Sequence, residues 1–325
     1  MKLPRRQFLH IAAGAAAFPA YSRPAAALDY PTRPARIMVG YTPGGAADIA
    51  ARLAAQWLSQ RFGQQFIVEN RPGAANNIAT EAVVQAASDG HTLLLISPTN
   101  TINATLYQHL SFDFVRDIAA IAGIAREPNV MVVSPSVPAE SVADFIAYAT
   151  ANPGRINYAS GGTGTSTHVS GALFAMMAGI DMVHVPYHGD AGALADLASG
   201  RVQVMFDLVT ASIGFIKAGK LRALAVTTAT RSDALPGLPT VAETIPGYEA
   251  IAWQGLGAPK NTPAEIVDKL NAEMNVAAAD SAFKARLADL GAAPFAASPV
   301  DFAKFVADDI AKWAKVIKIA GIKPE

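Results

Sequence analysis

The richest cluster of hydrogen-bonding groups in this sequence lies at residues 160–168. These nine residues include three glycines, three threonines and two serines, and they lead into a helical pattern from Val169. Glycines leave backbone N–H groups accessible, and a helix N-terminus carries partial positive charge, so such a turn can hold an anion. A plain polar loop is the alternative interpretation. We take as candidate ligand-binding residues Gly162, Thr163, Gly164, Thr165, Ser166 and His168.

A second glycine-rich turn, residues 41–48, follows an apolar run of strand length and precedes an amphipathic helical pattern. Glycines let the backbone approach a ligand closely, and Asp48 is placed to cap the following helix. Neither turn contains Arg or Lys. Two such turns facing each other across a cleft would hold a dianion by neutral donors and two helix N-termini. The candidate ligand-binding residues here are Tyr41, Thr42, Gly44, Gly45 and Asp48.

Three further junctions follow strand-like runs. Ser97 and Thr99 lie at the end of the run 93–97, Tyr187 follows the run 182–186, and Asp207 follows the run 202–206. Ligands of open parallel sheets bind at the carboxyl ends of the strands, so we add these four residues to the candidate site. Asp207 has two interpretations: a polar wall of the cleft, or a cap of the helix expected at 208–218.

Other chemistry fits the sequence less well. There is no Gly-Lys-Ser/Thr ending of a P-loop, and residues 162–164 lack the third glycine of a dinucleotide fingerprint. Ser166 and His168 lie two residues apart, which does not bring them together on a helix, and no Gly-x-Ser-x-Gly elbow is present. His184 and His188 have no carboxylate at a spacing that completes a metal site. We expect no enzyme, no cofactor and no metal.

Composition narrows the function further. The 325 residues contain no cysteine, which excludes thiolate-ligated zinc and iron–sulfur centres. The 26 basic and 26 acidic residues balance, so no basic surplus indicates nucleic acid binding. Hydrophobic residues make up 51%, enough for a large core, and the length suggests roughly two domains.

The first residues are typical of an export signal. Lys2, Arg5 and Arg6 precede a short apolar run at 11–20 and small residues at 25–27, which predicts a signal over residues 1–27 cleaved after Ala27. The arginine pair favours the twin-arginine route over the general secretory route. Removal of the signal takes four of the 26 basic residues, leaving 22 against 26 acidic ones, a net charge of −4. No later run is long enough to span a bilayer.

Strand-like runs alternate with helical patterns along the remaining chain, which predicts an α/β fold with parallel sheets covered by helices on both faces. Two crossings between halves are expected, at 124–135 and 248–259, with Trp253 in the core of the hinge or lining the cleft. The helical tail is too small for its own domain, so we expect it to pack back on the first half. The prediction is lobe 1 at 28–126 plus 252–325, lobe 2 at 127–251, and a two-strand hinge. We expect strands at 35–41, 65–70, 93–97, 130–134, 156–159, 182–186, 202–206 and 221–226, and helices at 47–62, 77–87, 141–151, 263–280 and 299–320.

Many separate motifs, in this order, resemble the periplasmic substrate-binding proteins of tripartite tricarboxylate transporters, the Bug family. They cover essentially the whole chain after the signal. The matching stretches are YPTRP at 30–34, PGG at 43–45 with Asp48, VENRPGA at 68–74, DGHTLL at 89–94, NYAS at 157–160, GTS at 164–166 with His168, HVPY at 184–187, AGKLRALAV at 218–226 and LPTVAE at 238–243.

The resemblance implies a type II periplasmic binding protein whose two Rossmann-like lobes close on a ligand like a Venus flytrap. Its ligand would be a small carboxylate (a dicarboxylate, acidic amino acid or aromatic acid), delivered to membrane permease subunits by a monomeric periplasmic protein. The family's anion loops map onto 41–48 and 160–168, its cleft tyrosine onto Tyr187 and its strand-end acid onto Asp207. Ala47, His188, Asp190 and Leu208 depart from the family pattern beside the presumed cleft. A ligand-sensing subunit for a membrane kinase and an exported hydrolase using Ser166 are the alternatives.

Overall fold

The computed structural model describes residues 29–187, 189–232 and 235–324. The predicted export signal at 1–27 and His188 lie outside these ranges. Pro31–Glu325 form one compact unit. Within the described ranges, no helix combines the length and the apolar character that a membrane crossing needs.

The first half of the chain builds a parallel sheet. Strands β1 (Ala35–Val39), β2 (Phe66–Asn70) and β3 (Thr92–Ile96) pair in parallel, with β1 in the middle. Helix α2 (Ala46–Phe62) packs on β1 and β2, and α3 (Asn77–Val84) packs on β1 and β3. The carboxyl ends of these three strands therefore lie at one edge, where the turns after β1 and β3 begin.

The second half builds a similar sheet from β5 (Ile156–Ser160), β6 (Met182–Pro186) and β7 (Val204–Leu208), again parallel, with β5 in the middle. Around them lie α6 (Val142–Ala151), α7 (Ser166–Ala178), α8 (Asp190–Ser199) and α9 (Val209–Lys217). The predicted α/β class with parallel strands is confirmed, and most predicted bounds agree within a few residues.

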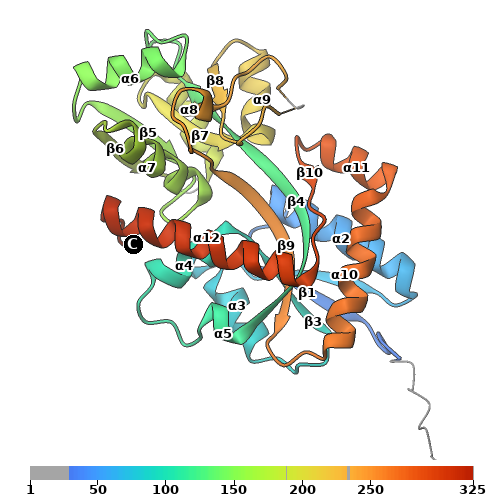
Figure 1. Ribbon diagram of the computed structural model, residues 1–325. Helices are drawn as coiled ribbons and strands as arrows, with labels where there is room; N and C mark the ends of the chain where they lie inside the picture. Colours follow the sequence, from blue (N-terminus) through green and yellow to red (C-terminus); the bar gives the residue numbers. More distant parts are fainter. Residues whose placement is uncertain (1–28, 188, 233–234, 325) are drawn as a thin grey trace, which may run out of the picture. The chain divides into compact units, whose positions relative to one another are not determined.

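Two long strands run through both halves (Figure 1). β4 (Ile118–Val133) pairs with β9 (Ile251–Pro259) in the first half, and with β7 and β8 (Arg222–Val226) in the second, in each case antiparallel. Both lie where crossings were predicted. The strand predicted at 130–134 is only the end of β4, because the preceding alanines and glycine have weak strand propensity and take strand form through pairing with β9.

The chain ends in helices, as predicted. α10 (Ala264–Ala279) packs on α2 and β4, and α12 (Pro299–Ala320) packs on β4 and on helices of both halves, α4 (Pro98–Leu106) and α7 (Figure 1). The division into two lobes at the predicted boundaries stays a prediction. Shorter elements that the sequence did not indicate are η1 (Ala74–Asn76), α5 (Phe114–Asp117), η2 (Val241–Glu243), α11 (Ser281–Ala288) and β10 (Ala293–Pro294).

Trp253 lies in the core of the first half and does not line a cleft. It has no exposed surface, and its Nε1 donates to Asp309 Oδ2 at 3.2 Å. The same carboxylate oxygen accepts from Thr101 Oγ1 at 2.6 Å. One buried acid of α12 thus joins a crossing strand to α4.

Two glycines face each other on the paired strands β4 and β9. Gly123 pairs with Gly255 in the sheet register. A Cβ on Gly123 would lie 2.4 Å from the carbonyl oxygen of Phe295, and a Cβ on Gly255 would lie 2.2 Å from Phe302 Cζ. The crossing is therefore packed too closely for any side chain at these positions.

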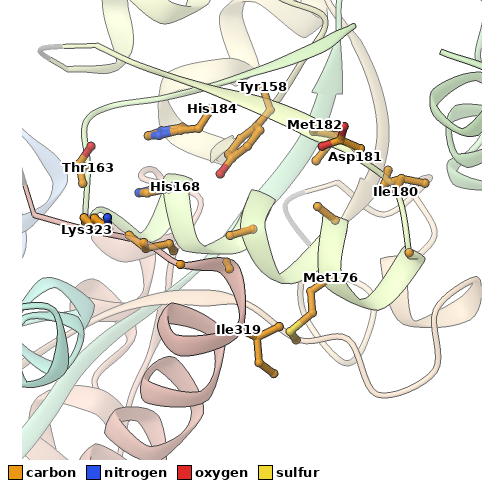
Figure 2. A pocket seen from close by; sticks show the side chains of 16 residues that line it. Tyr158, Thr163, His168, Met176, Ile180, Asp181, Met182, His184, Ile319 and Lys323 are labelled. Carbon is orange, nitrogen blue, oxygen red and sulfur yellow. The ribbon is translucent and has the colours of Figure 1, made fainter. Parts of the chain in front are cut away.

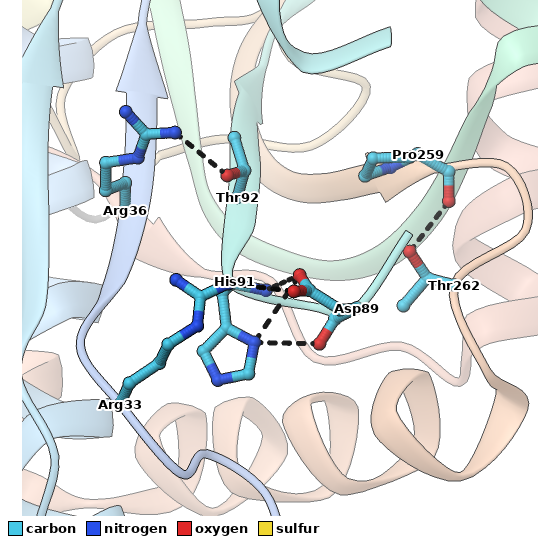
Figure 3. Close-up of polar contacts among 7 residues, drawn as sticks. All are labelled: Arg33, Arg36, Asp89, His91, Thr92, Pro259 and Thr262. Carbon is cyan, nitrogen blue, oxygen red and sulfur yellow. Dashed lines mark hydrogen bonds and ion pairs between the residues drawn. The ribbon is translucent and has the colours of Figure 1, made fainter. Parts of the chain in front are cut away.

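The DGHTLL motif forms a turn at the amino end of β3 (Figure 3). Asp89 accepts from Arg33 Nη2 at 2.8 Å and from the His91 backbone N–H at 3.0 Å. This turn lies at the edge of the sheet opposite to the turns that follow β1 and β3. Its contacts fasten the start of β1 to β3, which is a structural role.

Candidate functional site

The turns after β1 and β3 are joined by one tyrosine. The Tyr41 hydroxyl lies 2.8 Å from Ser97 Oγ and donates to Thr99 Oγ1 at 2.9 Å. Ser97 caps α4, and its hydroxyl and backbone N–H both contact the Asn100 side chain. Tyr41, Ser97 and Thr99 therefore form one hydrogen-bonded group.

Asp48 fixes the conformation of the turn after β1 through its hydrogen bonds. It is 2% exposed, and its carboxylate accepts from the Gly44 N–H, Arg52 Nε and Asn70 Nδ2, each at 2.9 Å. Burial raises the pKa of Asp48, but these hydrogen bonds outweigh burial, so the pKa lies below its ordinary value. The predicted cap is wrong in detail: Gly45 is the N-cap of α2, and Asp48 stands in its first turn.

We expect Asp48→Ala to lower the free energy of unfolding by about 2–3 kcal/mol, because it leaves a charged partner and two further donors without their acceptor. Urea unfolding at pH 7 measures this. The control is Asp308→Ala, which removes an exposed ion pair to Lys304 and should cost less than about 1 kcal/mol. Equal costs for the two variants would contradict the structural role of Asp48.

A segment that the sequence analysis overlooked lies at the same edge, after β2. Ala74, Ala75 and Asn76 all have left-handed backbone conformations, with φ of 44°, 48° and 70°. Such conformations cost non-glycine residues about 1–3 kcal/mol each and cluster at ligand-binding sites. Asn103 of α4 donates to the Ala75 carbonyl and to Asn77 Oδ1, which holds the segment in place. The Asn pair just before a helix was the available signal, because Asn tolerates this conformation.

The turn after β5 satisfies several of its own donors. The Gly164 N–H donates to His168 Nδ1 at 3.2 Å, and the Thr165 N–H and hydroxyl both donate to the Gly162 carbonyl, at 3.3 and 2.7 Å. Thr165 also caps α7, accepting from the His168 N–H. In contrast, the Ser166 hydroxyl has no hydrogen-bond partner among the described residues. The first-turn N–H groups of α7 have no intrahelical acceptor, so Ser166 offers the more available donors.

Two histidines pack behind this turn. The rings of His168 and His184 stack in parallel, with centroids 3.6 Å apart and an interplanar angle of 2°. Burial, and then the neighbouring His184, lower the pKa of His168 to about 3. His168 is therefore neutral, and its Nδ1 is occupied by the Gly164 N–H rather than by Ser166, so it supports the turn instead of activating a serine. Figure 2 shows both rings with Thr163 and Lys323 at one end of a cavity of about 620 Å³ that runs along α7.

The turn after β6 lies directly against the turn after β5. The Tyr187 N–H donates to the Ser160 carbonyl, and the Gly189 N–H donates to the Gly161 carbonyl. Asp190 Oδ1 lies 2.3 Å from the position that a Cβ on Gly161 would take. The Tyr187 hydroxyl donates to Asp196 Oδ2 at 2.8 Å, so here it orients α8.

Asp207 is the most enclosed of the predicted residues. Of its two interpretations, the helix cap is wrong, because β7 continues to Leu208, which is itself the N-cap of α9; the role as a wall of the cleft stays a prediction. Asp207 has no exposed surface; Oδ2 accepts from Ser212 Oγ at 2.6 Å, and Oδ1 has no partner among the described residues. Burial, followed by the charge of Asp190, raises the pKa of Asp207 well above its ordinary value.

Glu127, which follows Arg126 in a largely apolar stretch, was also missed. It is 1% exposed on β4, and its Oε1 accepts from Thr210 Oγ1 at 2.6 Å. Burial raises the pKa of Glu127 to about 7. Within the described ranges, no group of three or more metal-binding side chains is present.

The two halves meet at Gly164. A Cβ there would lie 2.9 Å from Leu106 Cδ2 and 3.8 Å from Asn103 Oδ1, both on α4, the helix that begins at the turn after β3. The turn after β5 therefore contacts the helix that Ser97 and Thr99 begin, and these in turn contact Tyr41. The turn after β5 thus lies against the later residues of α4, and Tyr41 lies against its first residues.

Comparison with known proteins gives consistent matches. The family model described as tripartite tricarboxylate transporter family receptor matches residues 50–322. Protein BugT of Bordetella pertussis is 34% identical over 303 residues, 92% of this chain and 93% of that protein. A Pseudomonas protein described as UPF0065 protein in the tcbD-tcbE intergenic region is 37% identical over 290 residues, covering 89% and 86% of the two chains.

Solved structures agree with these matches. R. palustris Rpa4515 with adipate superposes with a TM-score of 0.82 and 40% identity, covering 91% of this chain and 100% of that one. MatC from Rhodopseudomonas palustris with bound malate has a TM-score of 0.77 and 30% identity, covering 89% and 100%. The expected periplasmic binding-protein fold is confirmed.

Proposed function

Because this chain belongs to the tripartite tricarboxylate transporter family of receptors, we propose that it captures a small dicarboxylate between the turns after β1, β3 and β5 and delivers it to a membrane permease. A receptor of this family serves transport and is not an enzyme. The dicarboxylate class is supported by the adipate and malate bound to the two R. palustris proteins.

The observation that carries the proposal is the contact of Gly164 with α4. It supports a site in which donors from the turns of both halves reach the same ligand, as a clamp of two lobes at 28–126 plus 252–325 and 127–251 requires. Closure of such a clamp excludes water and strengthens each hydrogen bond to the ligand.

The turns after β1 and β5 contain no Arg or Lys of their own. The Ser166 hydroxyl and the first-turn N–H groups of α7 are neutral donors at the positive end of a helix, an arrangement that favours a carboxylate. Burial raises the pKa of Asp207, which favours its neutral form and so reduces its repulsion of a second carboxylate.

The test is titration calorimetry of Ser166→Ala with adipate and malate. Hydrogen bonds to a charged group contribute about 1.5–3 kcal/mol, so we expect affinity to fall roughly 10-fold or more. Ser281→Ala is the matched control, because Ser281 is also the first residue of a helix, α11, and lies outside the site. Unchanged affinity in Ser166→Ala would place the carboxylate elsewhere.

The remaining features of this function follow from the same proposal. The protein acts in the periplasm as a monomer, after residues 1–27 have directed it there by the twin-arginine route. Replacing Arg5 and Arg6 with lysines and following the protein by cell fractionation tests the route.

A further inference from the structure

A second cavity, of about 590 Å³, lies beside the crossing strands. Its lining includes Arg126 and Glu127 of β4, the residues that follow β8, and β10 with the end of α11. The position is set by the sheet: at residues 125–126, β4 pairs with β9 on one edge and β10 on the other, and at residues 130–133 it pairs with β8 and β7. The cavity therefore lies where β4 passes from one half to the other, and its lining joins residues of both halves.

The guanidinium of Arg126, which lines this cavity, stacks on aromatic rings. Its guanidinium carbon lies 3.7 Å from the centroid of the Phe295 ring and 5.2 Å from that of Phe305. Stacking of this kind fixes the plane of the guanidinium while leaving its N–H edges available. Among the described residues, Arg126 has no hydrogen-bond or ion-pair partner.

Two further cationic side chains line this cavity. Lys284 of α11 lines the cavity and has no ion-pair partner in the described part of the chain. Arg231 also lines it and pairs with Glu243 at 2.9 Å. The acids facing the same space are the buried Glu127, hydrogen-bonded to Thr210, and Glu249. Arg126 and Lys284 are thus the two cations of the lining without an ion pair among the described residues, and one of the two lining acids, Glu127, is protonated in part at pH 7.

We propose that this cavity is a second anion site, which binds a small dianion between Arg126 and Lys284. The volume falls within the range of small-molecule sites. Thr230 adds a hydroxyl from the segment after β8, in which the Thr228 hydroxyl donates to the Thr230 carbonyl, so a bound dianion contacts groups from both halves. Its lining includes no residue of the turns after β1, β3 and β5, so variants can test it independently of the carboxylate site proposed above.

Titration calorimetry at low ionic strength tests the proposal, with sulfate as the inorganic dianion and succinate as the organic one. Arg126→Gln and Lys284→Gln should each weaken sulfate binding roughly 5- to 10-fold, since each removes a charge-assisted hydrogen bond in a partly exposed site. Lys220→Gln, an exposed change of equal charge outside the cavity, should leave it unchanged. If Arg126→Gln also weakens succinate binding, the site accepts organic dianions; if it weakens only sulfate, the site is inorganic.

The inference is wrong if the unaltered protein does not bind sulfate at about 10 times the concentration that saturates a site with a millimolar Kd. It is also wrong if Arg126→Gln, Lys284→Gln and Lys220→Gln all bind sulfate equally well. Ser166→Ala separates the two proposals. It should lose adipate or malate affinity while keeping sulfate affinity, so either proposal can fail without the other.

Discussion

Gly255→Ala is expected to destabilise the protein by at least about 3 kcal/mol, which is the scale of severe overpacking. The added Cβ would lie 2.2 Å from Phe302 Cζ and 2.7 Å from the Ala122 carbonyl oxygen. Phe302 has no exposed surface, and the carbonyl belongs to the partner strand, so neither can move without disturbing the crossing. At roughly 2–4 °C per kcal/mol for a chain of this size, Tm should fall by about 6 °C or more.

Gly214→Ala is the matched control, since Gly214 lies in α9 and a Cβ there meets nothing within 4 Å. It should leave Tm unchanged or raise it, because alanine favours a helix by up to about 1 kcal/mol. The double variant Gly255→Ala with Phe302→Leu should recover at least about 1 kcal/mol relative to the sum of the single effects. Equal Tm values for the two glycine variants would show that the crossing is not tightly packed.

The second large effect concerns Glu127 and pH. A rise of its pKa from 4.5 to about 7 means that the folded protein binds this proton more tightly than the unfolded chain does. Its contribution to stability is therefore fully present below about pH 4.5 and is lost as pH rises through 7. The full shift corresponds to roughly 3 kcal/mol above that range.

Glu127→Gln keeps the shape and the hydrogen bond to Thr210 but cannot ionise. We expect the variant to be more stable than the unaltered protein by roughly 2–3 kcal/mol at pH 9, and similar to it at pH 5. Urea unfolding at both pH values measures the difference. Glu140→Gln, at an exposed position, should change stability by less than about 0.5 kcal/mol at either pH. A Glu127→Gln effect that does not grow with pH would contradict the assigned cause.

Strong local patterns made most of the fold predictable. The helix at 47–62 and the strand at 182–186 were placed nearly as observed, because periodicity and turn residues agree there. β4 was not, since its alanine-rich first part becomes a strand only through pairing with β9, a contact distant in sequence. The same distinction applies to the site: the glycine-rich turns could be found locally, whereas the contact between Gly164 and α4 depends on how the halves pack.

The environments of Asp207 and Glu127 and the left-handed backbone at residues 74–76 could not be predicted from the local sequence alone. Asp207 was found because it ends an apolar strand, but the environment of its carboxyl depends on neighbours from α8 and α9. Glu127 has no local signal at all, because its pKa depends on burial. The left-handed backbone at Ala74 and Ala75 contradicts the preference of alanine, so only the surrounding contacts impose it.

The packing of α12 on both halves has a consequence for the order in which the molecule assembles. The strand that completes the first sheet, β9, and the helix that covers both cores are made last, so early segments wait for distant ones before either core is closed. Folding that depends on such long-range pairs is slow compared with folding from local contacts. A partly made chain would expose the apolar faces of α4 and α7 until residues 299–320 arrive. Formation of the 22-residue helix α12 is therefore the step that commits the chain to its native state. Truncating this helix should leave collapsed material that aggregates instead of a smaller folded domain.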